Sequence, residues 1–293
     1  MTGQITSFEI SFLILYAVLL MCLSVYGAHR YYLAWLYKRH KKDVWVPKAR
    51  YDELPMVTIQ LPMYNEMYVA ERLIDATCTI RYPKDKLEIQ VLDDSTDGTV
   101  VIARAAVDKW AAQGFNIVYC HRKDRSGYKA GALKEGMKTA KGDFIAIFDA
   151  DFIPQPDFLE HTIHFFTEDR IGMVQVRWDH LNRDFNLLTR AQAVMLDGHF
   201  LIEHTARNRS GRFFNFNGTA GIWRRATIDD AGGWEHDTLT EDLDLSYRAQ
   251  LKGWQFVFLP DVLAPAEVPV EMNSFKSQQH RWAKGSMQTA KKT

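Results

Sequence analysis

The alternation of short apolar segments with longer amphipathic ones constrains the fold of this chain more than any other feature. From Pro55 onward, short runs rich in Val, Ile, Leu and Phe are followed by segments whose apolar residues recur at helical spacing. Strands that alternate with helices favour an α/β domain, because parallel neighbours in a sheet need a crossover connection. The sequence therefore predicts a mixed, mostly parallel sheet flanked by helices.

The pattern places each expected element along the chain. The expected strands are Val57 to Leu61, Leu87 to Leu92, Ile117 to Cys120, Phe144 to Phe148, Ile171 to Trp178, Ile222 to Arg224 and Trp254 to Leu259. The expected helices are Met67 to Ile80, Thr99 to Gln113, Lys129 to Thr139, Phe158 to Thr167, Leu187 to Thr205 and Leu243 to Lys252. Acidic and polar clusters follow the strands. Open α/β sheets bind ligands at the carboxyl ends of their strands, so we expect a site there.

The strand from Phe144 to Phe148 runs directly into two carboxylates, Asp149 and Asp151. Residues i and i+2 of an extended segment point to the same side, so both side chains can face one site. Two convergent carboxylates suit a hard divalent cation that also holds phosphate oxygens. This motif predicts a site for Mg²⁺ or Mn²⁺.

A second acidic motif, Thr240, Glu241 and Asp242, opens an expected helix, with Thr240 in the position of an N-cap. A carboxylate at this position can deprotonate an incoming hydroxyl group as a general base. The N-terminus of a helix stabilises an anion, so we expect such a base to act through its placement rather than through a raised pKa.

Near the end of the chain, Gln278, Arg281 and Trp282 share one face of an expected helix, because they occupy positions i, i+3 and i+4. A guanidinium can pair with a diphosphate, and an indole offers a flat surface to a sugar ring. The alternative for Trp282 is a core or interfacial tryptophan.

The segment from Phe8 to Ala28 is apolar apart from Glu9 and reaches roughly 30 Å as a helix, which is enough to span a bilayer. Aromatic residues and the basic run from Lys38 to Lys42 follow it. The positive-inside rule then places the N-terminus outside and everything after residue 40 in the cytoplasm. We expect residues 1–45 to form a membrane anchor and residues 46–293 a cytosolic catalytic domain. A signal peptide is disfavoured because no basic residue precedes the run.

Composition excludes two classes of protein. Lys plus Arg and Asp plus Glu are equal at 36 each, so no basic field recruits nucleic acid. The cysteines, Cys22, Cys78 and Cys120, are far apart in sequence. They predict neither a disulfide framework nor a zinc site, which fits a reducing compartment.

A set of motifs in chain order resembles the signature of processive family-2 glycosyltransferases with the GT-A fold, such as cellulose and hyaluronan synthases. The motifs are Asp93, Asp94 and Ser95, then Asp149 with Asp151, then Thr240 to Asp242, and finally Gln278 with Arg281 and Trp282. The resemblance runs from about Met56 to Lys284. The segments Gln60 to Glu66, Gly127 to Ala132 and Phe216 to Gly221 are most similar to cellulose-synthase-like mannan and glucomannan synthases and their bacterial cellulose-synthase-type relatives.

The resemblance implies how the donor, a nucleotide sugar, is held. It implies that Asp94, with Asp93, contacts the base and its ribose, and that Lys129 lies by the nucleotide or its diphosphate. It places Asp149 by the ribose, the diphosphate and the metal, with Asp151 as a ligand of Mg²⁺ or Mn²⁺. Gln278 and Arg281 would hold the diphosphate leaving group.

The resemblance also implies an acceptor side and an inverting reaction. Asp242 would be the general base for the acceptor hydroxyl, and Trp282 would stack under the acceptor sugar. A single in-line displacement on an α-linked donor, GDP-mannose or UDP-glucose, gives a β-linkage, here to the end of a growing β-1,4-linked polysaccharide. Residue types do not choose between the two donors.

Other functions remain open at this point. One is the transfer of a single sugar to a lipid carrier, and another is an inactive, anchored scaffold subunit. Taken alone, Asp93 to Thr96 reads best as a helix cap. Relatives that export their polymer continue into more membrane helices after the last motif. We therefore expect a separate membrane subunit or further C-terminal helices as partners.

Overall fold

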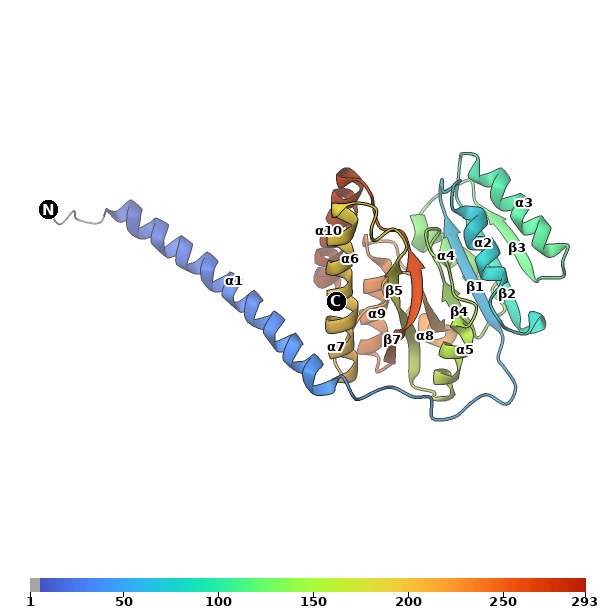
Figure 1. The fold of residues 1–293 in the computed structure, drawn as a ribbon, viewed down its shortest axis with the longest axis horizontal. Helices are drawn as coiled ribbons and strands as arrows, with labels where there is room; N and C mark the ends of the chain where they lie inside the picture. Colours follow the sequence, from blue (N-terminus) through green and yellow to red (C-terminus); the bar gives the residue numbers. More distant parts are fainter. Residues whose placement is uncertain (1–5) are drawn as a thin grey trace.

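The structure, a computed structural model, describes residues 6–293, so the first five residues of the expected anchor lie outside the described part. Its body is built around a seven-stranded sheet in the order β3-β2-β1-β4-β6-β5-β7 (Figure 1). The strands are β1 Val57–Met63, β2 Leu87–Asp93, β3 Ile117–His121, β4 Phe144–Ile147, β5 Ile171–His180, β6 Gly221–Arg224 and β7 Gln255–Ala266. The pairs β1–β2, β1–β4, β2–β3 and β5–β7 are parallel, whereas β6 runs antiparallel to β4 and β5. The prediction of a mixed, mostly parallel sheet is confirmed.

The helices follow the expected order with shifted ends. They are α1 Ser7–His40, α2 Ala70–Cys78, α3 Thr99–Ala111, α4 Tyr128–Met137, α5 Phe158–Thr162, α6 Leu187–Asp197, α7 Thr205–Arg209, α8 Arg225–Asp230, α9 Glu241–Leu251 and α10 Met272–Lys292. The expected helix from Phe158 to Thr167 changes to a 3-10 helix after Thr162. Strand β7 continues past the expected end at Leu259, beyond a register shift that its partner β5 makes between Val176 and Arg177.

Two core layers cover the two faces of the sheet, and β4 shows how the sequence divides them. Phe144, Ala146 and Phe148 belong to one layer, and Ile145 and Ile147 to the other, because successive side chains of a strand point to opposite faces. Helices α2, α3 and α5 contribute residues to the first layer, and α4, α8 and α9 to the second. Burial on both faces explains why the strands read as continuous apolar runs.

The expected helix from Leu187 to Thr205 is instead interrupted by a π-helical turn, η3, at Gly198–His204. Two histidines of this turn contact Asn217. His204 Nε2 lies 2.6 Å from Asn217 Oδ1, and His199 Nε2 lies 3.2 Å from Asn217 Nδ2. Wide turns of this kind are rare and are frequently found at functional sites. Here the two histidines of the turn contact Asn217, which lies in the segment that precedes β6.

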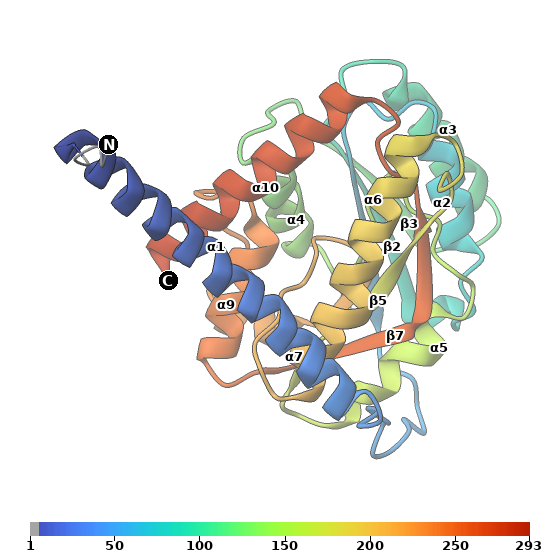
Figure 2. The same cartoon turned by 60° about the vertical axis from the view of Figure 1, so that its left-hand side comes forward.

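Helix α1 extends away from the body at its N-terminal end and joins it at the other end (Figures 1 and 2). Its apolar window is not buried inside the structure, and by length and composition the helix is a candidate membrane span. Near its end, Leu33 and Leu36 are buried against Ala206 of α7, and Arg30 forms an ion pair of 2.9 Å with Glu203. The expected apolar span thus continues without a break into a helix that packs on the domain.

Candidate active site

A cavity of about 790 Å³ lies at the carboxyl ends of β1, β2 and β4 and is bordered by α9 and α10. The predicted site residues that line it are Asp94, Lys129, Asp149, Asp151, Asp242, Gln278, Arg281 and Trp282. They come from segments distant in sequence that the parallel strands and the two C-terminal helices bring to one edge of the sheet. This is the edge at which open α/β sheets bind ligands.

Asp93 is the predicted site residue that does not line this cavity. Its side chain is fully buried beneath the loop after β2. It accepts a hydrogen bond of 2.6 Å from the hydroxyl of Tyr119 and one of 2.8 Å from the backbone N–H of Ser95. Neighbouring residues of a strand point to opposite sides, so Asp93 supports the loop from which Asp94 faces the cavity.

Asp94 is oriented by a two-pronged ion pair with Arg122, whose Nε donates to Asp94 Oδ1 at 2.7 Å. Arg122 also donates to the carbonyl oxygen of Tyr128 at 3.1 Å. A bidentate guanidinium–carboxylate pair is geometrically specific, so Asp94 has a fixed direction. The loop is not simply a helix cap, because α3 begins after Gly98 without a side-chain cap and Asp97 is the residue that accepts from Thr99 N–H.

Asp149 and Asp151 lie at the end of β4 in a group of acids that is only partly neutralised. Lys129 forms an ion pair with Asp149 and donates a hydrogen bond of 2.9 Å to the carbonyl of Gly218. Burial, followed by the charge of Asp149, raises the pKa of Asp151 to about 7. Burial and the same charge also raise the pKa of Glu66. Removing acids from water without enough positive charge disfavours their ionised forms.

This group of carboxylates fits a divalent cation. Its donors are hard oxygen atoms, which select Mg²⁺ or Mn²⁺, and the raised pKa values of Asp151 and Glu66 show that positive charge is in deficit. Glu66 belongs to a segment that resembles the mannan synthases, but no pattern in the sequence predicts that it lies beside Asp149. The end of β1 carries it there, because β1 is the strand next to β4.

Asp242 lies in the first turn of α9, and the cavity wall packs closely around it. A Cβ atom on Gly218 would lie 3.1 Å from Asp242 Oδ2, and Gly218 has a φ of +83°, so glycine suits this position for both reasons. Burial, followed by the charge of Glu241, raises the pKa of Asp242 to about 7. The expectation that the helix N-terminus leaves this pKa unraised is therefore wrong, because desolvation outweighs the helix dipole and the hydrogen bond from Leu243 N–H.

The segment 217–220 connects the metal end of the cavity with the base end. Thr219 Oγ1 accepts from the N–H of Asp149 at 2.9 Å. The buried side chain of Gln175 donates to the carbonyls of Thr219 and Ala220 and accepts from Asn217 N–H at 3.0 Å. Gln175 thus supports the segment 217–220. This role could not be predicted, because a glutamine in an apolar strand does not reveal its hydrogen-bond partners.

Helix α10 carries Gln278, Arg281 and Trp282 and lies directly against the start of α9. A Cβ atom on Gly285 would approach Thr240 Cγ2 to 2.5 Å, so glycine is needed for this contact. The N–H of Leu239 donates to Gln288 at 3.0 Å. Thr240 precedes α9 as expected, but its hydroxyl makes no cap and faces Thr289 at 3.4 Å.

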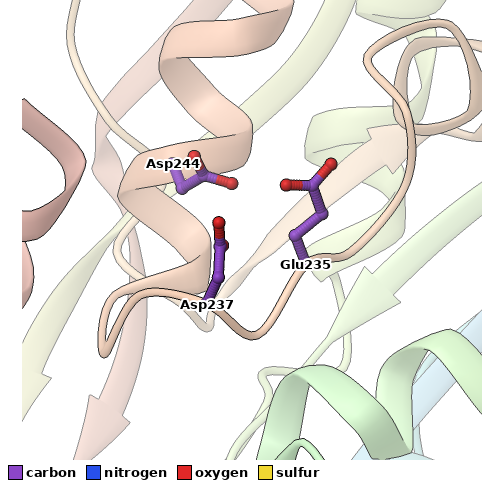
Figure 3. A group of neighbouring side chains, drawn as sticks. All are labelled: Glu235, Asp237 and Asp244. Carbon is purple, nitrogen blue, oxygen red and sulfur yellow. The ribbon is translucent and has the colours of Figure 1, made fainter. Parts of the chain in front are cut away.

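The far end of α10 is held by charge. Glu235, Asp237 and Asp244 place carboxylate oxygens within 4.8 Å of one another (Figure 3). Lys292 Nζ lies 2.8 Å from Asp237 and 3.1 Å from Asp244, and it also pairs with Glu235. Arg248 pairs with Asp244 at 2.7 Å. These two cations offset two of the three negative charges of the cluster, and the ion pair of Lys292 with Asp244 fastens α10 to α9.

The fold and the cavity together define a class of protein. A mostly parallel sheet with a carboxylate pair at the end of β4, faced by an acid at the start of α9, is the arrangement of a GT-A-type nucleotide-sugar domain. A solved mannosyltransferase from Pyrobaculum calidifontis, in complex with GDP-Man and Mn²⁺, has a similar fold, with a TM-score of 0.75 and 24% identity over 94% of this chain and 74% of that one. TarS of S. aureus, in complex with UDP-GlcNAc, is similar with a TM-score of 0.55 and 18% identity over 74% of this chain and 59% of that one.

The chain belongs to the family described as "Glycosyltransferase like family 2", whose profile matches residues 55–285. It is 47% identical to glucomannan 4-beta-mannosyltransferase 1 of Oryza sativa subsp. japonica over 82% of this chain and 47% of that protein. It is 44% identical to glucomannan 4-beta-mannosyltransferase 2 of Arabidopsis thaliana over 93% of this chain and 53% of that protein. The chain spans about half the length of these relatives. The resemblance to cellulose-synthase-like mannan synthases is confirmed.

Proposed function

We propose that this domain transfers mannose from GDP-mannose to the end of a β-1,4-linked mannan or glucomannan, with inversion at the anomeric carbon. The observation that carries the proposal is the meeting of Asp151, Asp242 and Trp282 in one cavity. The choice of mannose over glucose rests on the names of the glucomannan mannosyltransferases to which the chain is similar.

In this proposal Asp149 and Asp151 hold Mn²⁺ or Mg²⁺, and a bound cation supplies charge stabilisation for the diphosphate as it leaves. Lys129 balances the acids and approaches the same phosphate oxygens from the side of Gly218. Gln278 and Arg281 donate hydrogen bonds to the diphosphate from α10. Asp94 accepts from the ribose or the base at the opposite end of the donor.

Asp242 removes the proton from the attacking acceptor hydroxyl. The hydroxyl oxygen forms a bond to the anomeric carbon while the bond from that carbon to the diphosphate oxygen breaks, and the proton stays on Asp242. A pKa of about 7 suits this step, because a general base works best when its pKa is near the working pH. Attack from the side opposite the leaving group turns an α-linked donor into a β-linked product.

The acceptor glycan lies against Trp282 and against Trp178 and His180, which line the same cavity. Indole rings present flat apolar faces that match the C–H faces of pyranose rings. Trp178 was expected only as the last residue of a strand, and β5 continues beyond that expected end to His180. Their position extends the proposed acceptor site beyond the single tryptophan of the last motif.

The proposal places the domain on the cytoplasmic side of a membrane, with α1 as the anchor. The basic residues that follow the apolar part of α1 support this orientation. Export of a polymer needs a channel, which we assign to further membrane helices or to a separate subunit.

The test offers membranes that carry the protein radiolabelled GDP-mannose and, separately, UDP-glucose, with Mn²⁺ and a short mannan primer. We expect label from GDP-mannose in a polymer that an endo-β-1,4-mannanase degrades. Membranes with Asp242→Asn serve as the matched control. Label only from UDP-glucose, or only in a lipid-soluble product, contradicts the proposal.

A further inference from the structure

The strand order fixes the direction in which a nucleotide sugar lies along the cavity. The carboxylates for the diphosphate end β4, in the middle of the sheet. Asp242 and Trp282 come from α9 and α10, and α9 packs with β7 in the core layer on that side. Under the function proposed above, the sugar and the acceptor then lie on the side of β6, β5 and β7. The nucleoside is left with the ends of β1, β2 and β3.

That corner contains an aromatic residue and a cation in direct contact. Tyr64 follows β1 and Arg125 follows β3, and both line the cavity beside Asp94. The guanidinium carbon of Arg125 lies 3.3 Å from the centroid of the Tyr64 ring and 5.0 Å from that of Tyr128. Stacking on a ring holds the plane of a guanidinium in one orientation.

The backbone next to Tyr64 is fixed to the loop after β2. Asn65 has a positive φ of 55°, and its N–H donates to Ser95 Oγ at 2.8 Å. Its side-chain oxygen accepts from Thr96 N–H at 2.9 Å. Asp94 N–H donates to the carbonyl of Met63 at 3.1 Å. Tyr64 and Asp94 are thereby held at a fixed separation before any nucleotide binds.

Arg125 has no acid to neutralise it within residues 6–293, where it forms no ion pair or side-chain hydrogen bond. Its Nε is buried without a partner. Arg122, three residues earlier, is already committed to Asp94 and to Tyr128. A half-buried guanidinium with free donors beside the nucleoside end of the cavity needs acceptor atoms, since an unpaired buried polar atom is costly.

We propose that Arg125, held in plane by Tyr64, reads the nucleobase of the donor and selects guanine. The proposal rests on the function proposed above for the cavity. Guanine presents two adjacent acceptors, O6 and N7, to the two-pronged donor of an arginine. Adenine has a donor amino group in place of O6, and uracil has no second acceptor beside O4. Tyr64 is a positioning residue, and Arg125 is the residue that contacts the base.

The experiment measures dissociation constants of GDP, ADP and UDP for the full chain in detergent by calorimetry, with saturating Mn²⁺. We expect wild type to bind GDP at least about tenfold more tightly than ADP or UDP. Arg125→Lys keeps the charge but loses the fork, and it should weaken GDP binding about 10- to 100-fold while changing UDP binding less than about threefold. Tyr64→Ala should also weaken GDP binding more than UDP binding, and Tyr64→Phe should keep the selectivity for GDP.

Matched controls lie in the same segments. Lys123→Ala removes an exposed charge near Arg125, and Tyr68→Ala removes a ring that is 91% exposed, and neither residue lines the cavity. Both should bind GDP as wild type does. Equal weakening of GDP and UDP by Arg125→Lys indicates a phosphate or ribose contact and overturns the proposal. Unchanged selectivity in both Arg125→Lys and Tyr64→Ala overturns it as well.

The measurement separates this inference from the proposed function, because GDP, ADP and UDP carry no sugar and no acceptor is present. If the wild-type protein makes mannan but Arg125→Lys keeps the selectivity for GDP, the role of Arg125 is refuted and the proposed function stands. If selection of GDP depends on Arg125 but the protein makes no mannan, the proposed transfer is refuted and the role of Arg125 stands.

Discussion

At the scale of single residues, Asp242 combines two properties that oppose each other. Burial raises its pKa to about 7 from an ordinary value of 3.8. The ionised carboxylate is therefore less stable in the folded protein than in the unfolded chain. Below about pH 4 the carboxyl group is protonated in both the folded and the unfolded state, and it costs no stability. The cost in unfolding free energy grows between about pH 4 and pH 7 and is complete above about pH 7. The acid that we assign to catalysis is kept at a cost in stability.

The first prediction follows from that balance. Asp242→Asn removes the charge but keeps an oxygen that can accept from Leu243 N–H. We expect the variant to lose transfer by at least about 10²-fold. At pH 8 its free energy of unfolding should rise, by up to about 4 kcal/mol for the full pKa difference. Denaturant unfolding at pH 5 and pH 8 checks this, and a variant that is destabilised more at pH 8 than at pH 5 contradicts it.

The same pKa predicts how activity depends on pH. A general base must be ionised in the donor complex that meets the acceptor, so kcat/KM for the acceptor should rise tenfold per pH unit below about pH 7 and level off above it. Measurements from pH 5.5 to pH 8.5 at saturating Mn²⁺ and donor give the midpoint. A midpoint near pH 4 would mean that the acid is not buried in the way that the structure shows.

Asp151 supports a third prediction, on the metal. Asp151→Ala removes an oxygen ligand, so binding of GDP should lose its dependence on Mn²⁺, with at least about tenfold weaker affinity. Asp143→Ala is the control, because Asp143 is exposed at the opposite end of the same strand. Calorimetry with and without Mn²⁺ measures both variants. A Mn²⁺ effect on Asp151→Ala as large as on wild type would exclude it as a ligand.

At the scale of elements, the placement of α10 decides whether Arg281 and Trp282 reach the cavity. The contact between Gly285 and Thr240 sets the distance between α9 and α10. Even a methyl group on Gly285 forces the helices apart, because the atoms it meets belong to a buried threonine. A displacement of about 1 Å at a reacting centre can cost about 10²-fold in rate.

The fourth prediction is that Gly285→Ala lowers kcat at least about tenfold while the domain stays folded. Gly198→Ala is the matched control, since a Cβ atom on Gly198 meets nothing within 4 Å. The double variant Gly285→Ala with Thr240→Ala removes the two nearest obstructing atoms, Cγ2 and Oγ1 of Thr240, and should recover toward the rate of Thr240→Ala alone. Wild-type kcat in Gly285→Ala would show that this contact does not position α10.

At the scale of the whole molecule, α1 has two parts with different surroundings. Its apolar part is exposed, whereas Leu33 and Leu36 are only 3% and 2% exposed because they pack on α7. Burying a leucine stabilises a fold by about 1.5–3 kcal/mol, so the end of α1 contributes to the stability of the α/β domain.

The fifth prediction separates the two parts by truncation. A chain that begins at residue 29 should leave the membrane fraction and keep its thermal unfolding temperature within a few degrees. A chain that begins at residue 43 loses the packing of Leu33 and Leu36 and the Arg30 ion pair, and should unfold several degrees lower. Flotation and scanning calorimetry measure the two effects. Retention of the first truncation in carbonate-washed membranes contradicts the anchor role of α1.

Much of the fold and of the cavity could be predicted from sequence. Strand positions follow from apolar runs, and the motifs converge because parallel strands end at one edge of the sheet. The different directions of Asp93 and Asp94 could also be predicted, because neighbouring residues of a strand point to opposite sides. The raised pKa of Asp242 could not be predicted, because it depends on burial by a loop and a helix far away in the chain. The π-helical turn and the support from Gln175 depend on contacts of the same kind.

The unbroken course of α1 has a mechanical consequence. A flexible linker would let a domain tumble relative to its anchor, but here one continuous helix joins the exposed apolar segment to the protein body. From residue 28 to residue 40 that helix rises about 18 Å. In the membrane orientation proposed above, this rigid connection holds the cavity at a constant distance from the lipid and at a constant tilt.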